Sequence, residues 1–471
     1  MKKMNIIQAI RFTLDKEENV ERMLVHLNDY GYVVIAEVAT LKEVELQKNR
    51  FWEYIEGLET REDRGRILRN DPETWKDENW LGNKSTGIIR SPNFCHSEFM
   101  WTSRTFPKVK QAFSEIWKND EMLVSYDAGN AFRPWKYNPQ WVTEGNWWHV
   151  DQNCRKGPSR QGRVCVQGLV TYYDVTEETG GLCVIPGSHL YHEEVCERSP
   201  SGKLLQDYVY IAEDDPILKL NPPVIVGAKA GDLILWDSRL AHCNTPSTKA
   251  PAREEMKYKE NILPSNASST ASLEKGSWTN LKINNPKLTS ADSDEDKENS
   301  NSPVSDLEWI HITDGSHNYP HDGGIDFELI DQSDASSPRV GKIGTSTSNV
   351  ILSEAGRQKD CLITEKVNES NSYGDMELIR LVSYVCMLPR SFATPAIIRS
   401  RKRGFLYRVP TSHWPTELIP LHMTDDRNYN TVNWRDVSPE IMKLIGFASW
   451  EIQLRKFRVS EVCRDFYNMV R

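Results

Sequence analysis

The sequence lacks the cysteine spacing of a disulfide framework or of a zinc-binding motif. Its nine cysteines are odd in number and scattered, and no two of them form a Cys-x-x-Cys pair. Disulfide-rich folds and structural zinc sites are usually recognised by such spacings. We therefore expect reduced cysteines, as is usual inside cells, and no structural zinc site.

Long apolar runs and targeting signals are also missing. No stretch of about twenty apolar residues occurs, so we expect no membrane-spanning helix and no membrane partner. The N-terminal stretch MKKMNIIQAIRFTLDKEEN returns to charged residues too early for a signal peptide. The chain ends in NMVR, which is not an SKL-type peroxisomal tail. These features predict a cytoplasmic protein, with the nucleus as the alternative.

An excess of positive charge is absent as well. The 58 Lys and Arg residues are outnumbered by 67 Asp and Glu residues, which gives a net charge of −9. A broad non-specific nucleic-acid surface needs the opposite balance, so no nucleic-acid partner is expected. The basic run at 399–403 would suit a nuclear signal or a phosphate contact. A solvated surface strand or loop is the favoured interpretation.

What the chain does contain is an aromatic core, with 15 Trp and 17 Tyr among 471 residues. Residues 1–120 mix helix and strand: the apolar spacing predicts helices over 17–30, 41–58 and 106–119, and a strand over 32–38. From residue 121 onward, short runs rich in Val, Ile, Tyr and Trp alternate with Gly, Pro and Asp, which is typical of a sandwich or barrel. The sequence predicts a mainly β protein with flanking helices (α+β).

Two segments interrupt or follow this β-rich part. Residues 254–375 are rich in Ser, Asp, Asn and Lys and poor in aromatics, which predicts a disordered insertion. The β pattern then resumes with a buried strand over 378–389. We therefore assign the β core to 121–253 and 376–415, with the insertion in one loop of a single sheet. Residues 416–471 are interpreted as a C-terminal helical extension.

A candidate metal site follows from three residues. His149 and Asp151 are two apart in NWWHVDQN, and side chains two apart on a strand point to the same side. Two His and one carboxylate on one face of the metal are the usual ligands of Fe(II) oxygenases. Other His-x-acid triplets occur at 96–98 and 192–194, so this pair alone is weak evidence. His242, just after the strand-like GDLILWDS, supplies a third candidate ligand.

Three blocks, taken together and in order, carry a specific resemblance. GNWWHVDQN, ETGGLCVIPGSH (178–189) and GDLILWDSRLAHCNTP (231–246) resemble the phytanoyl-CoA dioxygenase family of Fe(II)/2-oxoglutarate oxygenases. The resemblance covers most of 30–253 and 376–450. It implies a double-stranded β-helix (jelly-roll) fold, with His149, Asp151 and His242 as catalytic iron ligands. It also implies contacts of Gln167 and Asn244 with 2-oxoglutarate.

The arginine that should pair with the distal carboxylate of 2-oxoglutarate has two candidates. A guanidinium suits this role because its planar fork grips a carboxylate through two hydrogen bonds. In the family this arginine follows the distal histidine by about ten residues and opens the next strand. Arg253 fits the count, whereas Arg380 opens RLVSYVCM and fits the context. We favour Arg380, because a strand end is a rigid support and Arg253 borders the predicted insertion.

The resemblance implies an enzyme that uses Fe(II), 2-oxoglutarate and O₂ on a small-molecule or acyl substrate. Related halogenases replace the carboxylate ligand with a small residue, so Asp151 favours hydroxylation or oxidative demethylation. One alternative is a pseudo-oxygenase, a jelly-roll that binds a partner or metabolite without turnover. Another is that the Ser-rich insertion is the functional part, a docking tail switched by phosphorylation.

Overall fold

The computed structural model describes residues 5–7, 9–58, 60, 64–204, 206–251, 376–419 and 437–454. The predicted insertion 254–375 lies outside the described residues, and so does Arg253. Of the predicted extension 416–471, the described residues include helices α9 (Pro439–Ile445) and α10 (Ser449–Leu454). All described residues belong to one compact unit, residues 1–266 and 370–471. Within them, no helix combines the length and apolar character that crossing a membrane requires.

Two β-sheets form the centre of this unit. The first has the strand order β1-β11-β9-β13-β7-β10. Its strands are β1 (Asn5–Ile7), β11 (Val224–Val226), β9 (Gly181–Val184), β13 (His242–Thr245), β7 (His149–Val150) and β10 (Val209–Tyr210). Apart from the parallel pair β1–β11, its neighbours are antiparallel.

The second sheet has the order β2-β3-β12-β8-β14-β6-β4, and β5 also pairs with β14. Its strands are β2 (Arg11–Phe12), β3 (Tyr32–Ile35), β12 (Leu233–Asp237), β8 (Val166–Thr171), β14 (Arg380–Pro389), β6 (Gly129–Phe132), β4 (Ile88–Ile89) and β5 (Met122–Val124). Strand β14, from beyond the predicted insertion, pairs with β8 from before it. The two sheets with their flanking helices form a double-stranded β-helix, which confirms the predicted fold class.

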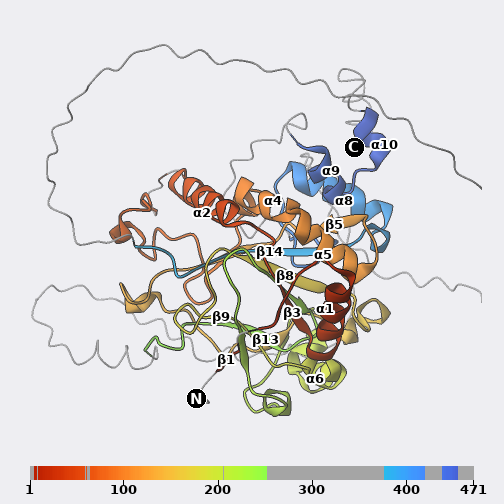
Figure 1. Ribbon diagram of the computed structural model, residues 1–471, viewed down its shortest axis with the longest axis horizontal. Coiled ribbons are helices and arrows are strands. Elements are labelled where there is room, and N and C mark those ends of the chain that lie inside the picture. The colour runs from red at the N-terminus through yellow and green to blue at the C-terminus, as the bar shows by residue number, and fades with distance from the viewer. Residues whose placement is uncertain are drawn as a thin grey trace, which may run out of the picture. The chain divides into compact units, whose positions relative to one another are not determined.

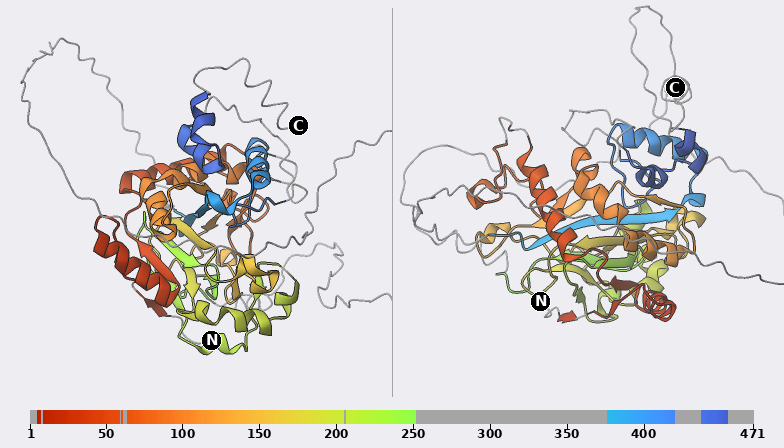
Figure 2. Two further views of the ribbon diagram at one scale, coloured as in Figure 1. Left: turned by 90° about the vertical axis from the view of Figure 1, so that its right-hand side faces the viewer. Right: turned by 45° about the horizontal axis from the view of Figure 1, so that its top comes forward.

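The helices cover the outer face of the second sheet. Helices α4 (Glu98–Thr105) and α5 (Pro107–Trp117) lie over β14 in Figures 1 and 2. Helix α1 (Glu17–Tyr30) and helix α2 (Leu41–Glu56) match two predicted helices. Gly31 ends α1 in the left-handed conformation at φ 80°, and Thr40 and Glu43 form a capping box at the start of α2. The remaining helices are α3 (Pro92–Cys95), α6 (His192–Arg198) and α8 (Pro395–Leu406).

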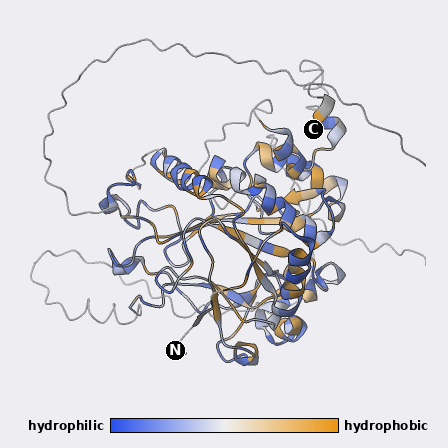
Figure 3. Ribbon diagram, in the orientation of Figure 1, coloured by the Kyte–Doolittle hydropathy of each residue, from blue (hydrophilic) through white to orange (hydrophobic). Residues whose placement is uncertain are grey.

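Apolar side chains bury both faces of the second sheet. In β3, Val33 and Ile35 pack with the helices, while Tyr32 and Val34 pack into the space between the two sheets. This alternation explains why the strand reads YVVI, because each face of the sheet has its own core. In Figure 3, hydrophilic and hydrophobic positions alternate along helices α1 and α2, as expected of helices with one buried face.

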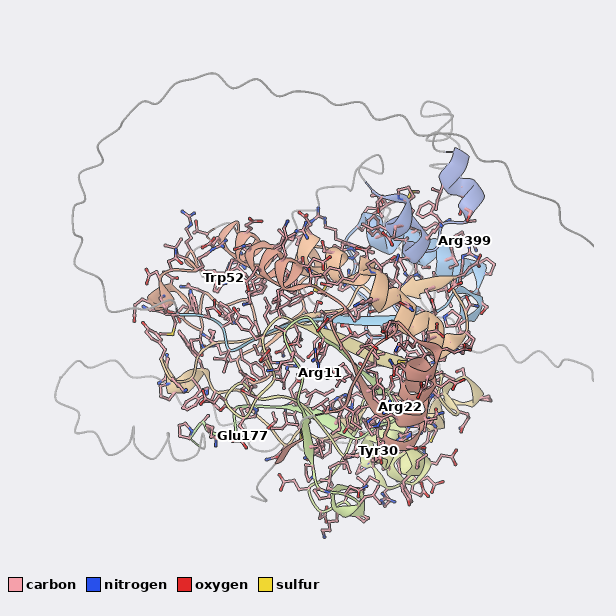
Figure 4. All side chains as sticks on the ribbon, in the orientation of Figure 1. Arg11, Arg22, Tyr30, Trp52, Glu177 and Arg399 are labelled. Atoms are coloured by element: carbon pink, nitrogen blue, oxygen red, sulfur yellow. The ribbon has the colours of Figure 1, made fainter. Side chains whose placement is uncertain are left out.

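The basic run at 399–403 is not the solvated strand or loop that we predicted. It lies in helix α8, and only part of it faces solvent: Arg399, labelled in Figure 4, is exposed, whereas Arg401 is fully buried. The Arg401 guanidinium donates to the backbone oxygens of Val124 (2.8 Å), Leu444 (2.9 Å) and Ile445 (3.1 Å). Charge pattern alone could not reveal this, because the carbonyls that accept these bonds come from distant segments.

Candidate metal centre

Two histidines face each other across neighbouring strands. His149 begins β7, His242 begins β13, and the antiparallel register places them directly opposite one another. Their ring centroids lie 4.2 Å apart, and each residue is 4% exposed. Asp151 follows β7, where its backbone N–H donates to the backbone oxygen of Ser238 at 2.8 Å. The fold thus brings together the three residues that the sequence suggested as metal ligands.

Each imidazole is oriented by a backbone carbonyl. The Nδ1 atom of His149 lies 3.1 Å from the backbone oxygen of Trp147, and Nδ1 of His242 lies 2.8 Å from that of Leu240. With the proton on Nδ1, both contacts are hydrogen bonds, and each Nε2 lone pair is then available to a metal. The two Nε2 atoms lie 3.6 and 3.3 Å from the carboxylate oxygens of Asp151. One donor atom from each residue lies within 4.8 Å of the others.

The electrostatics of the group suit a cation. Burial opposes the charged form of Asp151, but His149 and His242 outweigh it and hold the pKa of this carboxyl well below its usual range. Burial, and secondarily the neighbouring His149, lowers the pKa of His242. At neutral pH, Asp151 is therefore an anion and His242 a neutral imidazole. These are the protonation states in which both residues can bind a metal ion.

Gln167 and Asn244 come from different sheets near this group. From β8, the Nε2 of Gln167 donates to Asp151 Oδ2 at 2.8 Å. From β13, the Nδ2 of Asn244 donates to the Tyr384 hydroxyl at 3.0 Å. Gln167 thus orients the candidate metal ligand Asp151, whereas the amide of Asn244 contacts Tyr384 on β14. Contacts of these two residues with 2-oxoglutarate stay a prediction.

Arg380, the first residue of β14, is a buried cation without a counter-ion. It is 2% exposed, and its guanidinium donates weakly to Asn130 Oδ1 (3.3 Å) and Asn244 Oδ1 (3.4 Å). Its Nη1 has no hydrogen-bond partner, and no carboxylate of the described residues pairs with it. Burial lowers the pKa of Arg380. An unpaired guanidinium of this kind is costly to bury, and a bound carboxylate would satisfy it.

The two-residue period of the strands explains why these side chains converge. On β14, Arg380 and Tyr384 share a face with Val382, which packs into the core between the sheets. On β13, His242 and Asn244 are likewise two apart, and the contact between Asn244 and Arg380 shows that this side faces the second sheet. The polar residues therefore occupy one end of an inner surface that is otherwise apolar.

Sequence reasoning missed His413 and Tyr208, which contact the candidate ligands. His413 donates from Nε2 to the backbone oxygen of Asp151 at 3.0 Å. Trp147 and Tyr208 both stack with the His149 ring, with centroid distances of 5.1 and 4.6 Å. Burial, followed by the charge of Asp151, raises the pKa of Tyr208 to about 12. No spacing rule links His413 and Tyr208 to the ligands, because each comes from a different segment of the chain, whereas Trp147 is only two residues from His149.

Comparison with known proteins identifies a matching family and several similar proteins. The profile of the phytanoyl-CoA dioxygenase (PhyH) family matches residues 27–253. Ava biosynthesis cluster protein O of Aspergillus versicolor is 30% identical over 165 residues, which are 31% of this chain and 49% of that protein. The chain thus spans about half the length of this relative. A Dictyostelium discoideum protein named after phytanoyl-CoA dioxygenase is 24% identical over 245 residues, 45% of this chain and 67% of that protein.

Among solved structures, the α-ketoglutarate-dependent epimerase SnoN from nogalamycin biosynthesis is 16% identical, with a TM-score of 0.34 over 50% of this chain and 80% of that one. The carbocyclase SnoK from nogalamycin biosynthesis is 16% identical, with a TM-score of 0.32 over 49% of this chain and 79% of that one. The profile match, together with the two relatives, assigns residues 27–253 of the chain to the phytanoyl-CoA dioxygenase (PhyH) family of Fe/2-oxoglutarate oxygenases.

Proposed function

We propose that the chain is an Fe(II)- and 2-oxoglutarate-dependent dioxygenase that hydroxylates a small-molecule or acyl substrate. The observation that carries this proposal is the combination of His149, Asp151 and His242 with the unpaired, buried Arg380. Two imidazoles and one carboxylate match the ligand set of Fe(II) oxygenases. The free Nη1 of Arg380 matches the distal carboxylate of 2-oxoglutarate. A chain that bound only a metal would have no use for a buried cation without a partner.

Each residue has a distinct role in this proposal. His149, Asp151 and His242 would hold Fe(II) and leave its other positions to 2-oxoglutarate and O₂. Arg380 would bind the far carboxylate of 2-oxoglutarate, with Asn244 orienting its guanidinium. Gln167 would keep Asp151 aimed at the metal. When bound, the iron would couple the oxidative decarboxylation of 2-oxoglutarate to the activation of O₂ for attack on the substrate.

The surroundings of His149 support a substrate with an apolar body. Trp147 and Tyr208 flank its ring, and Tyr208 is 41% exposed, so an incoming molecule would meet aromatic surface beside the metal. A small-molecule substrate also agrees with the relative from Aspergillus versicolor, which is named for a biosynthesis cluster. The carboxylate of Asp151 favours hydroxylation or oxidative demethylation over halogenation.

The test begins with anaerobic addition of Fe(II) and 2-oxoglutarate to the purified chain. We expect the weak visible charge-transfer absorption of the metal-bound keto acid, and its loss in His149→Ala. Admission of O₂ should then produce succinate slowly even without a substrate, and candidate substrates should accelerate it. The absence of absorption in the wild type would refute the proposal. Absorption without succinate, whatever compound is added, would favour a pseudo-oxygenase.

A further inference from the structure

A second cluster of metal-binding side chains lies near the candidate iron site. It consists of Cys154, at the start of a short 3₁₀ turn (Cys154–Lys156), and of His192 and Cys196 on helix α6. His192 and Cys196 are four residues apart, which places both on one face of the helix. One donor atom from each of the three residues lies within 4.8 Å of the others, and all three residues are buried.

The spacing of these donors suits a tetrahedral ion. Donors that bind zinc at about 2.0–2.3 Å in tetrahedral geometry lie roughly 3.5–3.8 Å from one another. The Sγ of Cys196 lies 3.3 Å from Nε2 of His192. The backbone oxygen of Gln152 lies 2.5 Å from that Nε2 and 3.7 Å from Cys196 Sγ, so it borders the cluster as a hydrogen-bond acceptor. To bind an ion together with the two sulfurs, His192 would give up its contact with the Gln152 oxygen and present the Nε2 lone pair instead.

We propose that Cys154, His192 and Cys196 bind a zinc ion, separate from the iron, that anchors the segment following Asp151. Two sulfur ligands and one imidazole select a soft or borderline ion such as Zn²⁺, whereas the iron site has only nitrogen and oxygen donors. The sequence shows no zinc motif because the three ligands do not form the usual paired spacing. It is the fold that assembles them, by packing α6 against the 3₁₀ turn.

Cys154 of the cluster lies three residues after Asp151 in the sequence, which suggests a role in positioning that residue. Asp151, Gln152, Asn153 and Cys154 are consecutive, so the ion would hold one end of a segment whose other end carries an iron ligand. Gln152 already ties this segment to the next loop, through bonds from its Nε2 to the backbone oxygens of Arg160 (2.9 Å) and Gly162 (2.7 Å). The ion would therefore position Asp151 without contacting iron or substrate.

The alternative to a zinc site is a metal-free cluster in which both cysteines are thiols. Burial raises the pKa of Cys154, and it raises the pKa of Cys196 to about 12, so without a metal both would be neutral thiols. His192 would then simply donate to the Gln152 carbonyl. Zinc binding instead requires two thiolates and releases about two protons per ion. The two states thus differ in bound metal, in proton balance and in sulfur–metal bonding.

Cobalt(II) is the probe that separates the two metal centres. The full-length chain would be stripped with a chelator and titrated with Co²⁺, and the intense near-ultraviolet thiolate-to-cobalt absorption recorded. The iron site has no sulfur ligand and cannot give this absorption. We expect saturation at about one equivalent of this signal per chain in the wild type and in His149→Ala, and its loss in Cys196→Ser. Cys95→Ser, a change at another fully buried cysteine, is the matched control and should retain it.

Zinc content of the freshly purified chain gives an independent readout, with about one ion expected in the wild type and none in Cys196→Ser. If Cys196→Ser fails to fold, Cys154→Ser, at the most exposed of the three ligands, replaces it. The proposal is overturned if the wild type shows no thiolate-to-cobalt absorption, or if peptide mapping finds a Cys154–Cys196 disulfide. Failure of the iron proposal would leave the cobalt signal unchanged, so the two results are distinguishable.

Discussion

The unpaired charge of Arg380 allows the affinity for 2-oxoglutarate to be predicted quantitatively. In Arg380→Met, a bound 2-oxoglutarate loses two charge-assisted hydrogen bonds, each contributing about 1.5–3 kcal/mol. Part of that loss is offset, because the variant no longer has the desolvation cost of a buried guanidinium. A net loss of about 3 kcal/mol corresponds to a Kd that is roughly 100-fold weaker. Without ligand, stability should change by less than about 1 kcal/mol, because the lost long bonds to Asn130 and Asn244 offset removal of a buried charge.

Anaerobic denaturation with Fe(II) present, at several 2-oxoglutarate concentrations, measures both quantities. At 100 times the wild-type Kd, 2-oxoglutarate raises the wild-type free energy of unfolding by about 2.7 kcal/mol, and that of Arg380→Met by only about 0.4 kcal/mol. Arg380→Lys, which keeps the charge but loses the fork, should fall between them. Wild-type stabilisation in Arg380→Met, together with its loss in Arg253→Met, would refute the reasoning and move the carboxylate site to Arg253.

Three further perturbations follow from buried polar contacts. Gln167→Leu removes the hydrogen bond to Asp151 and should weaken iron binding about 10-fold in an anaerobic Fe(II) titration; unchanged affinity would contradict an orienting role. Arg401→Met leaves buried backbone oxygens unpaired and should cost about 3 kcal/mol or more in urea denaturation, whereas Arg399→Ala on the exposed side of the same helix should stay within about 0.5 kcal/mol. Burial opposes the charged form of Asp237, but its ion pairs with Arg239 and Arg163 outweigh burial and lower the pKa of this carboxyl. The carboxylate therefore stabilises the fold fully above about pH 5, and this stabilisation is lost as the pH falls toward the folded-state pKa. Asp237→Asn should therefore be less stable than the wild type at pH 7 and show a shallower loss on acidification; parallel pH profiles would argue against this ion pair.

Local sequence signals were sufficient for the longer elements. Helix α1 and the start of strand β3 were predictable, because apolar periodicity, Gly31 and a β-branched run place the helix end at Tyr30 and the strand start at Tyr32. The strand end was not, since the prediction extended to residue 38 and β3 ends at Ile35. The short strand β4 was not, since Ile88–Ile89 lies in a polar part of the sequence. Its pairing with β6 is a long-range contact, and two residues carry no periodic signal. Sheet order escaped prediction for the same reason.

The candidate ligands were predictable because strand geometry leaves a trace in the sequence. His149 and Asp151 are two apart, and His242 follows a clear strand. The residues that orient them leave no such trace: His413 comes from beyond the predicted insertion, and Asn130 reaches Arg380 from another strand. Their positions depend on how distant segments pack, which a single sequence does not display.

The contacts of Asp151 connect the proposed iron site to distant segments of the chain. Its carboxylate accepts from Gln167, its backbone oxygen accepts from His413, and its backbone N–H donates to Ser238. These partners come from three separate parts of the chain, and the proposed zinc cluster would hold a fourth connection through Cys154. Because a ligand displaced by even a fraction of an ångström binds metal less well, Asp151 is kept in place by long-range contacts rather than by its own short strand. In the proposed iron site, metal binding and folding would therefore be coupled, and loss of any one of these partners should weaken metal binding before it unfolds the protein.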